Sequence, residues 1–498
     1  MGLSATLSIA QAALQANANQ TTLVSRNIAG VNDPGYSRRI GQVTSAADGI
    51  TSVTISRASN LELFNQLIGS TADAQSAQAI ADGLDQLEQT VNLTTSASNS
   101  ENETPAGTSP ADLLAKMQAA LTSYTAAPDN AALGQAFLSS AKALATTLDQ
   151  ASTTIQNVRK QADTNISNAV ADANSLLSQF TDVNTAIVKG TATGADISDA
   201  LDKRDSILSS LAKDMGITTT TNSDGSMSIY TDSGVTLFDR TPNTISFSTT
   251  TTFADGTTGN AVIVAGIPLT GSSSVMPLAG GSIAGLTTLR DTVTVQYQNQ
   301  LNQVASGLIS AFADTDQTGG SAPTIPGLFT YAGAPAMPTT GQTGLASAIT
   351  VNTNADPSQG GSLSRIRDGN VGDPTNTAYN ANTTGAAAFS TRLNALVTGL
   401  NTAQTFNPAS GGASSGTLAA YAASSVSWLE TARSTATSTA TNASAIVSQA
   451  TTSLSNSTGV NLDDQLSLML DLEHSYSASA ELMSTVKSMF GTLINAMQ

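Results

Sequence analysis

Both ends of this 498-residue chain carry apolar residues at the alternating four- and three-residue spacing of a coiled-coil seam. The N-terminal seam runs through Leu3, Leu7, Ala10, Leu14, Asn17, Thr21, Val24 and Ile28. The C-terminal seam runs through Leu462, Leu466, Met469, Glu473, Tyr476, Ala480, Met483, Lys487, Phe490, Ile494 and Met497. The pattern predicts one long helix at each end. The two helices either pair with each other or each cover a core, and the spacing alone does not choose between these readings.

The sequence also indicates where the first of these helices ends. Gly30 is suited to the position just after a helix, so the first helix is predicted to end near Ala29. Pro34 and Gly35 follow in the places they take in a type II turn. Tyr36 comes directly after that turn, and we expect its ring to act as a packing anchor.

Charge and composition exclude several functions. The chain has 36 acidic and 19 basic residues, no cysteine and one histidine, His474. Without cysteine there is no disulfide, no thiolate nucleophile and no Cys-ligated metal. The net charge of −17 opposes binding to nucleic acid or to anionic membranes. Residues 1–42 carry +2 and residues 460–498 carry −4, so the two terminal helices should attract each other.

The chain shows no sign of entry into a membrane or the general secretory pathway. Its first 20 residues contain no Lys or Arg and no continuous apolar stretch, so they do not form a secretory signal peptide. No run approaches the roughly 18 apolar residues of a membrane-spanning helix.

Between the termini, helical spacing gives way to short β-type runs and then returns. The predicted fold class is mainly α with β-rich insertions. Residues 1–56 and 455–498 form a terminal coiled-coil domain, and residues 57–215, 284–313 and 386–454 a helical stem. Residues 216–283 form an inserted β-rich domain. Residues 314–385, rich in Gly, Pro and Thr, form loops or a second small β insertion.

No catalytic, cofactor-binding or metal-binding residue is predicted. His474 lies in the C-terminal heptads, where a solvated side chain is expected. Asp202 and Asp205 share one helix face, which allows the paired carboxylates of a wall-degrading enzyme but favours a salt-bridged helix surface. Asp314 and Asp316 begin like a calcium loop yet lack its glycine and glutamate, so they indicate a turn.

The terminal motifs resemble those of the bacterial flagellar axial proteins, the rod, hook and hook-associated proteins. The N-terminal signature is NIAGVNDPGYSR, from Asn27 to Arg38, and the C-terminal one begins GVNLDD at Gly459. The Tyr-Ser-Arg and Gly-Val-Asn-Leu-Asp forms are typical of the hook-associated members, and LDKRDSIL from Leu201 agrees with them.

This resemblance implies an extracellular structural protein, exported through the flagellar type III pathway without a cleaved signal. It would form a ring of like subunits at the junction of hook and filament. Its partners would be hook protein, a second hook-associated junction protein and a cytoplasmic export chaperone, with no nucleic acid and no membrane insertion. The alternatives are another axial protein (hook or distal rod) and, further away, a secreted adhesin or surface-layer protein.

The resemblance and the heptads together predict an assembly interface at the two ends of the chain. Because both seams contain polar residues, we expect the ends to be disordered in the monomer and to fold on assembly. The predicted interface residues are Leu3, Leu7, Leu14, Val24, Asn27, Ile28, Pro34, Gly35, Tyr36, Leu462, Leu466, Met469, Tyr476, Met483, Phe490 and Ile494.

Overall fold

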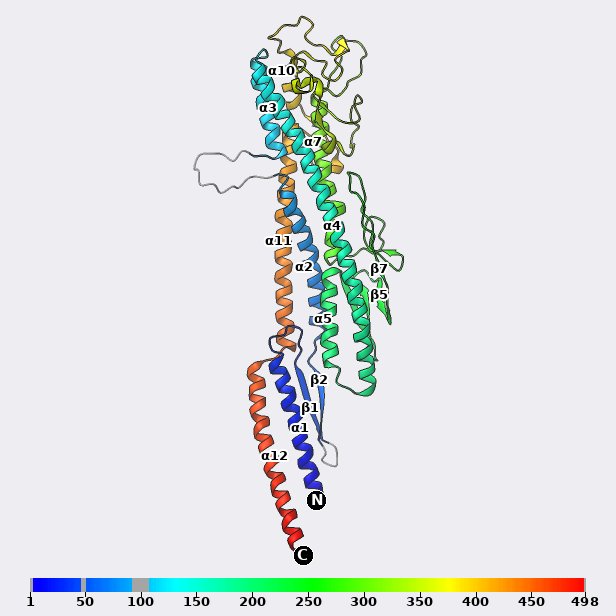
Figure 1. The fold of residues 1–498 in the computed structure, drawn as a ribbon, viewed down its shortest axis with the longest axis vertical. Coiled ribbons are helices and arrows are strands. Elements are labelled where there is room, and N and C mark those ends of the chain that lie inside the picture. The colour runs from blue at the N-terminus through cyan, green and yellow to red at the C-terminus, as the bar shows by residue number, and fades with distance from the viewer. Residues whose placement is uncertain (1–2, 46–50, 92–106, 497–498) are drawn as a thin grey trace, which may run out of the picture.

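The computed structural model describes residues 3–45, 51–91 and 107–496. The molecule is elongated, with its long helices running along the long axis and both chain ends at the same extremity (Figure 1). Small antiparallel sheets lie alongside the helices. The predicted fold class, mainly α with β-rich insertions, is confirmed.

The extremity that holds both termini consists of two helices and a hairpin. Helices α1 (Leu3–Ala29) and α12 (Leu462–Ala496) lie side by side. Strands β1 (Arg39–Ser45) and β2 (Thr51–Arg57) pair antiparallel and lie against α1. The end of α1 agrees with the prediction, and Asn461 caps α12 by accepting from the amide of Asp463 at 3.0 Å. The hairpin was not predicted from the sequence.

The stem is a bundle of long helices around one continuous core. Its longest member, α4, has 63 residues, and its buried side chains recur every three or four positions. A loop predicted at residues 95–110 falls mostly on 92–106, outside the described residues. The stem helices are α2 (Leu61–Glu88), α3 (Pro110–Ala126), α4 (Ala131–Thr193), α5 (Ser198–Asp214), α6 (Ser282–Thr288), α7 (Thr294–Ala311), α10 (Thr391–Asn401) and α11 (Leu418–Thr458).

Residues 217–268 form a β unit on one side of α4 (Figure 1). Gly225 turns the first hairpin with φ of 82°, a backbone conformation that favours glycine. One sheet has the order β3-β4-β5-β6 and the other β7-β8-β9. The strands are β3 (Ile217–Thr221), β4 (Met227–Thr231), β5 (Thr236–Asp239), β6 (Thr241–Pro242), β7 (Ile245–Ser246), β8 (Ile263–Val264) and β9 (Ile267–Pro268).

Two buried arginines fasten this β unit to the stem. Arg290 lies in a π-helical turn, Leu289–Val293, between α6 and α7. Its guanidinium pairs with Asp163 of α4 at 2.5 Å and donates to the carbonyl of Asn260 at 2.9 Å. Arg159 of α4 donates to the carbonyl of Ala254 at 3.2 Å. Because Arg290 is ion-paired and both guanidiniums are hydrogen-bonded, these contacts fix the β unit in one position.

Residues 314–385 cover the end of the stem away from the termini (Figure 1). They contain the strand pair β10 (Phe329–Thr330) and β11 (Thr350–Val351) and the short helices α8 (Leu345–Ala348) and α9 (Ser364–Asp368). Asp314 pairs with Arg392 of α10 at 2.5 Å, and Asp316 accepts from the amides of Thr318 and Ala322. The interpretation as turn chemistry is therefore confirmed for Asp316, whereas Asp314 is buried and pairs with a distant arginine instead. A last pair, β12 (Gln404–Thr405) and β13 (Ser415–Gly416), precedes α11.

The close approach of α6 to α2 depends on Gly285. A Cβ at this position would lie 2.2 Å from the carbonyl oxygen of Ser76. We predict that Gly285→Ala lowers the free energy of unfolding by about 2 kcal/mol, because backbone atoms of two packed helices must move apart. Gly69→Ala in α2 is the matched control, since a Cβ there meets nothing within 4 Å and should stabilise the helix by about 0.5 to 1 kcal/mol. Urea unfolding measures both, and equal effects would contradict the close-packing argument.

Candidate assembly interface

The predicted seam of α1 faces inward. Val24, Ala10 and Asn17 are buried, and Leu7, Leu14, Thr21 and Ile28 are half-buried. The side chain of Leu3 lies outside the described residues. Asn17 donates to the hydroxyl of Ser475 on α12 at 2.9 Å. The first of the two readings of the heptads is therefore confirmed, because the terminal helices pair with each other.

The seam of α12 is shifted by one residue in half of its positions. Met469, Met483 and Phe490 are half-buried and form one row of the seam, as predicted. The second row of the seam is not the predicted one of Leu466, Glu473, Ala480 and Lys487. It runs instead through Gln465, Leu472, Ser479 and Val486, of which all but Ser479 are buried. The reason is energetic, since this row places Leu472 and Val486 inside and leaves Glu473 and Lys487 in water.

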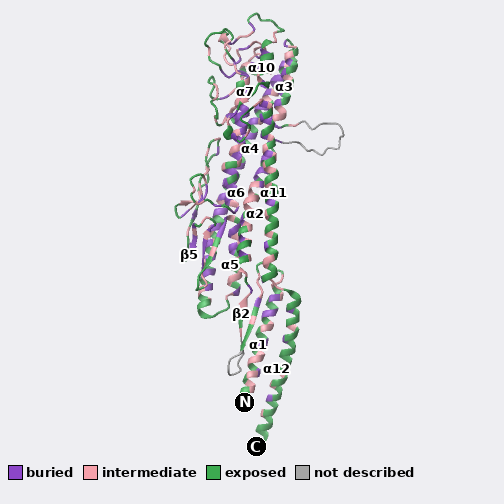
Figure 2. Cartoon of the chain, turned by 180° about the vertical axis from the view of Figure 1, so that it is seen from behind, coloured by how far each residue is buried: buried purple, intermediate pink, exposed green. Residues whose placement is uncertain are grey.

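The shift leaves large apolar side chains of α12 in solvent. Leu462, Leu466, Tyr476 and Ile494, which were expected to pack against α1, are 42 to 55% exposed. Figure 2 shows α12 as mostly exposed along its whole length. At 100° per residue, the exposed apolar side chains fall on both sides of the seam as well as on the seam rows themselves. Leu466, Leu470 and Ile494 lie on one side, Leu468, Leu482 and Met489 lie on the other, and Leu462, Tyr476 and Leu493 continue the two seam rows with their side chains still exposed.

Charge plays a different part from the one expected. The described residues include no ion pair between α1 and α12, although the two ends carry opposite net charge. The polar contacts that join these helices are amide and hydroxyl hydrogen bonds instead.

Asn27 is the centre of the junction between α1, β1 and α12. Its side chain is 1% exposed and makes four hydrogen bonds. The amide nitrogen donates to the carbonyl of Arg39 at 2.9 Å and to Gln465 at 2.8 Å. The amide oxygen accepts from the backbone nitrogen of Arg39 and from the hydroxyl of Tyr36, both at 2.9 Å. An amide is the side chain that can satisfy two donors and two acceptors at once, which explains an asparagine at this position.

The loop after α1 is a turn, but not of the predicted type. The amide of Tyr36 donates to the carbonyl of Asp33 at 3.0 Å, with Pro34 and Gly35 between them. The φ of Gly35 does not lie in the left-handed region, so the turn is not type II. Gly30 is required for another reason, because a Cβ there would lie 2.6 Å from the ring of Tyr36.

The ring of Tyr36 is the packing anchor that was expected after this turn. It is half-buried on Gly30, and the guanidinium of Arg39 lies 4.6 Å from its centroid. Burial is the main cause that raises the pKa of Tyr36 above its usual value of 10.0, so the hydroxyl that donates to Asn27 stays protonated at neutral pH.

Arginines of the hairpin bind aspartates of α5 and thereby attach the terminal domain to the stem. Arg39 pairs with Asp199 at 2.8 Å and with Asp202 at 2.6 Å. Arg57, opposite Arg39 in the hairpin, pairs with Asp202 at 3.2 Å and also with Asp205. The sequence interpretation of Asp202 and Asp205 as a salt-bridged face is confirmed. Its partners come from about 150 residues away, and helix spacing gave no signal for them.

Asp202 should contribute more to this joint than Asp199. Asp202 is largely buried and accepts from both arginines, whereas Asp199 is 86% exposed. We predict that Asp202→Asn destabilises the chain by about 2 to 3 kcal/mol, because it leaves buried guanidinium groups without a counter-charge. Asp199→Asn should cost about 0.5 kcal/mol, as for an exposed pair. Thermal unfolding of both variants measures the difference, and a larger loss for Asp199→Asn would refute this ranking.

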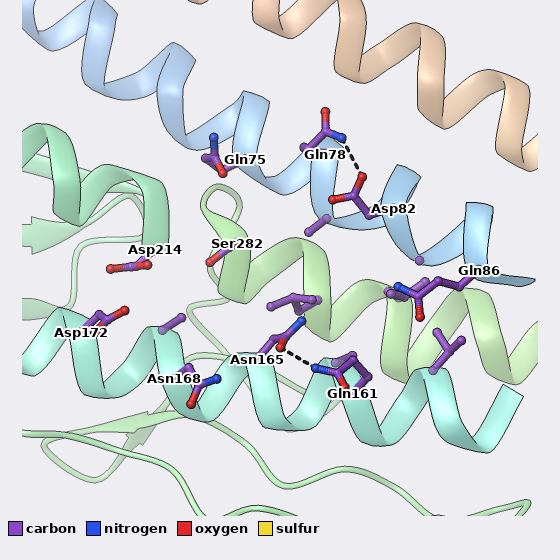
Figure 3. A pocket seen from close by; sticks show the side chains of 17 residues that line it. Gln75, Gln78, Asp82, Gln86, Gln161, Asn165, Asn168, Asp172, Asp214 and Ser282 are labelled. Atoms are coloured by element: carbon purple, nitrogen blue, oxygen red, sulfur yellow. Dashed lines mark hydrogen bonds between the residues drawn. The ribbon is translucent and has the colours of Figure 1, made fainter. Parts of the chain in front are cut away.

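A pocket of about 340 Å³ lies between α2, α4 and α6 (Figure 3). Its lining mixes apolar side chains with several amides, and Gln161 donates to Asn165 at 2.9 Å. Asp214, at the end of α5, has its pKa raised to about 7, first by burial and then by the nearby charge of Asp172. The described residues contain no group of three or more His, Cys, Asp or Glu side chains placed to hold a metal ion. His474 is exposed on α12, as expected.

The raised pKa of Asp214 makes stability depend on pH. Because its native pKa, about 7, lies above the unfolded value of 3.8, the native state holds this proton more tightly. The resulting stabilisation is complete below the unfolded value and is lost as pH rises to the native value. We predict that Asp214→Asn raises the melting temperature near pH 8 and leaves it nearly unchanged near pH 4. Asp172→Asn should give a smaller rise, and a melting temperature of Asp214→Asn that is lowered at pH 8 would contradict the assignment.

Within the described residues, no helix is long and apolar enough to cross a membrane.

Two family models match parts of this chain. Residues 102–327 match the family model described as the flagellar hook-associated protein FlgK helical domain. Residues 453–496 match the one described as the flagellar basal body rod FlgEFG protein C-terminal. The stem and the terminal helix therefore confirm the resemblance to the flagellar axial proteins.

Within that class, the curated relatives support a flagellar hook-associated protein 1. The proteins of that name from Salmonella typhimurium (strain LT2) and Salmonella typhi are each 28% identical over 325 residues, covering 59% of this chain and 54% of the relative. The matched region thus spans about half the length of these relatives. The solved structure of the flagellar hook junction protein FlgK from Burkholderia pseudomallei aligns with 54% of this chain and 47% of that one, at 20% identity and a TM-score of 0.41.

Proposed function

We propose that this chain is a structural component of the bacterial flagellum that forms the junction between hook and filament by self-assembly through its terminal helices. It has no enzymatic role in this proposal. The observation that carries it is the exposed apolar surface on both sides of the α12 seam. The names of the curated relatives add the location at the hook.

The pair of helices α1 and α12 buries too few apolar side chains to be stable on its own. On α12, Gln465, Leu472 and Val486 are the buried residues among those described, and Gln465 is polar. Each of the half-exposed apolar side chains of α12 forgoes roughly half of the about 1.5 to 3 kcal/mol that full burial would give. A helix with this much exposed apolar area becomes stable when neighbouring helices cover it. This supports the hypothesis that the ends are disordered in the monomer and fold on assembly.

The arrangement of this surface favours a ring or helical array over a dimer. Leu466 and Leu470 lie on one side of the seam, and Leu482 and Met489 on the other, so the two sides are different surfaces. Contacts between two different surfaces of like subunits are heterologous and repeat around an axis. Each copy would thereby contact one neighbour on either side.

The other partners follow from the same assignment. We place hook protein on one side of the ring and the second hook-associated junction protein on the other, with a cytoplasmic export chaperone binding the C-terminal region before export. The protein would act outside the cell after passage through the flagellar type III pathway. The chief competitor remains another axial protein, hook or distal rod, because the C-terminal match is to a model shared with rod proteins.

The decisive test removes the exposed apolar surface without touching the α1–α12 seam. We predict that the double variant Leu466→Ser/Leu482→Ser folds with unchanged stability of the stem but is incorporated into flagella at least about tenfold less than the natural chain. The matched control is Ile446→Ser, which removes a 51% exposed side chain from α11 of the stem and should incorporate normally. Deletion of residues 460–498 should abolish incorporation and leave the stem folded.

Immunogold labelling locates the protein. Label confined to the boundary of hook and filament is the expected result. Label along the whole hook would assign a hook protein instead. Filament growth supported by the deletion variant would refute assembly through the terminal helices.

A further inference from the structure

A groove of about 970 Å³ lies at the joint between the terminal domain and the stem. Its walls come from α2, α5 and α11 of the stem and from the loop of residues 30–37 that follows α1. Its lining is part apolar, with Leu61, Phe64 and Leu454, and part cationic, with Arg204 and Lys213. Leu61 is 54% exposed at the groove, which leaves an apolar contact surface uncovered within the chain.

Arg204 is the unusual side chain of this groove. The residue is 9% exposed, and its buried Nε has no hydrogen-bond partner among the described residues. Its single charged contact joins Nε to Asp205 at 3.7 Å, too long for a hydrogen bond, and Asp205 already binds Arg57. Burial lowers the pKa of Arg204, which reflects the cost of keeping this charge away from water. A buried guanidinium with unused donors is a site prepared for a carboxylate.

The charge balance of the groove agrees with an acidic ligand. Arg57, Arg204 and Lys213 line it together with two acids, Asp33 and Asp205, so its net charge is positive. The whole chain carries −17. A positive, partly apolar groove on an acidic protein is complementary to a segment that combines carboxylates with leucines.

The first turns of α12 present such a segment. Asp463 lies beside Leu470, on the side of the helix that also carries Leu466 and Leu462, and all four are exposed. The chain's own α12 is held with its opposite side on α1 through the contact of Gln465 with Asn27 and the buried Leu472. The segment that enters the groove must therefore come from another molecule.

We propose that the groove binds the leucine-bearing side of the first turns of α12 from a second copy of this chain, with Arg204 and Lys213 receiving the carboxylate of Asp463. This inference deepens the proposed self-assembly and rests on it. Because the groove is walled by both the terminal domain and the stem, the bound helix would also fix the angle of the joint between them.

The absence of cysteine from the chain allows a direct test by cross-linking. Two full-length variants, Ser209→Cys in the groove and Leu466→Cys on α12, are produced together in the native bacterium in place of the natural chain, and isolated flagella are oxidised. We expect a disulfide between the two variants. The matched control replaces Leu466→Cys with Leu493→Cys, which is equally exposed at the far end of α12 and should cross-link at least about tenfold less.

Charge variants test the role of the groove's cations. Lys213→Gln, at an exposed position, should lower the cross-link yield without affecting folding. Arg204→Gln should lower it further, with its melting temperature measured beside it. Equal cross-link yields for Leu466→Cys and Leu493→Cys would overturn the groove assignment, and so would yields that neither charge variant changes. The proposed function would stand in both cases if the chain is present in the flagella. Absence of the chain from flagella would overturn both.

Discussion

The ion pairs between the hairpin and α5 are the contact on which the arrangement of this molecule depends. The terminal domain is thin, and its hairpin reaches the stem through Arg39 and Arg57. These arginines stand opposite each other in the β1–β2 register, so a shift of the hairpin by one residue would separate them from their aspartates. A second link, the amide of Arg38 donating to the carbonyl of Thr458 at 2.8 Å, lies beside them. The direction of α1 and α12 relative to the stem thus follows from a few charged contacts.

Uncharged polar groups hold the terminal helices together where a stable coiled coil would use leucines. Asn27 with Gln465, and Asn17 with Ser475, bond across the pair. Buried polar contacts of this kind specify register at a cost in stability. A pair that is well specified but weakly stabilised suits a segment that must find one partner arrangement and then depend on neighbours for its stability.

Much of the fold could be predicted from the sequence, because the signals for helices are local. The end of α1 followed from Gly30, and the helical stem from apolar spacing. The predicted seam of α12 was wrong by one residue in one of its two rows, because Met469, Met483 and Phe490 belong to both possible seams. The charges at Glu473 and Lys487 were the sign that favoured the seam seen in the structure. The hairpin was missed because its strands are rich in small hydroxyl residues and polar alternation is weak. The partners of Asp202 and the isolation of Arg204 are long-range facts that no local pattern contains.

The placement of both termini at one extremity has a consequence for how this protein can vary. The β unit and residues 314–385 connect to the stem along its side and at its far end, away from α1 and α12 (Figure 1). An insertion or deletion in either part changes the outline of the molecule without altering the chain ends. The outer surface can therefore differ between related proteins, while the two terminal helices keep the same geometry at the extremity that holds both chain ends.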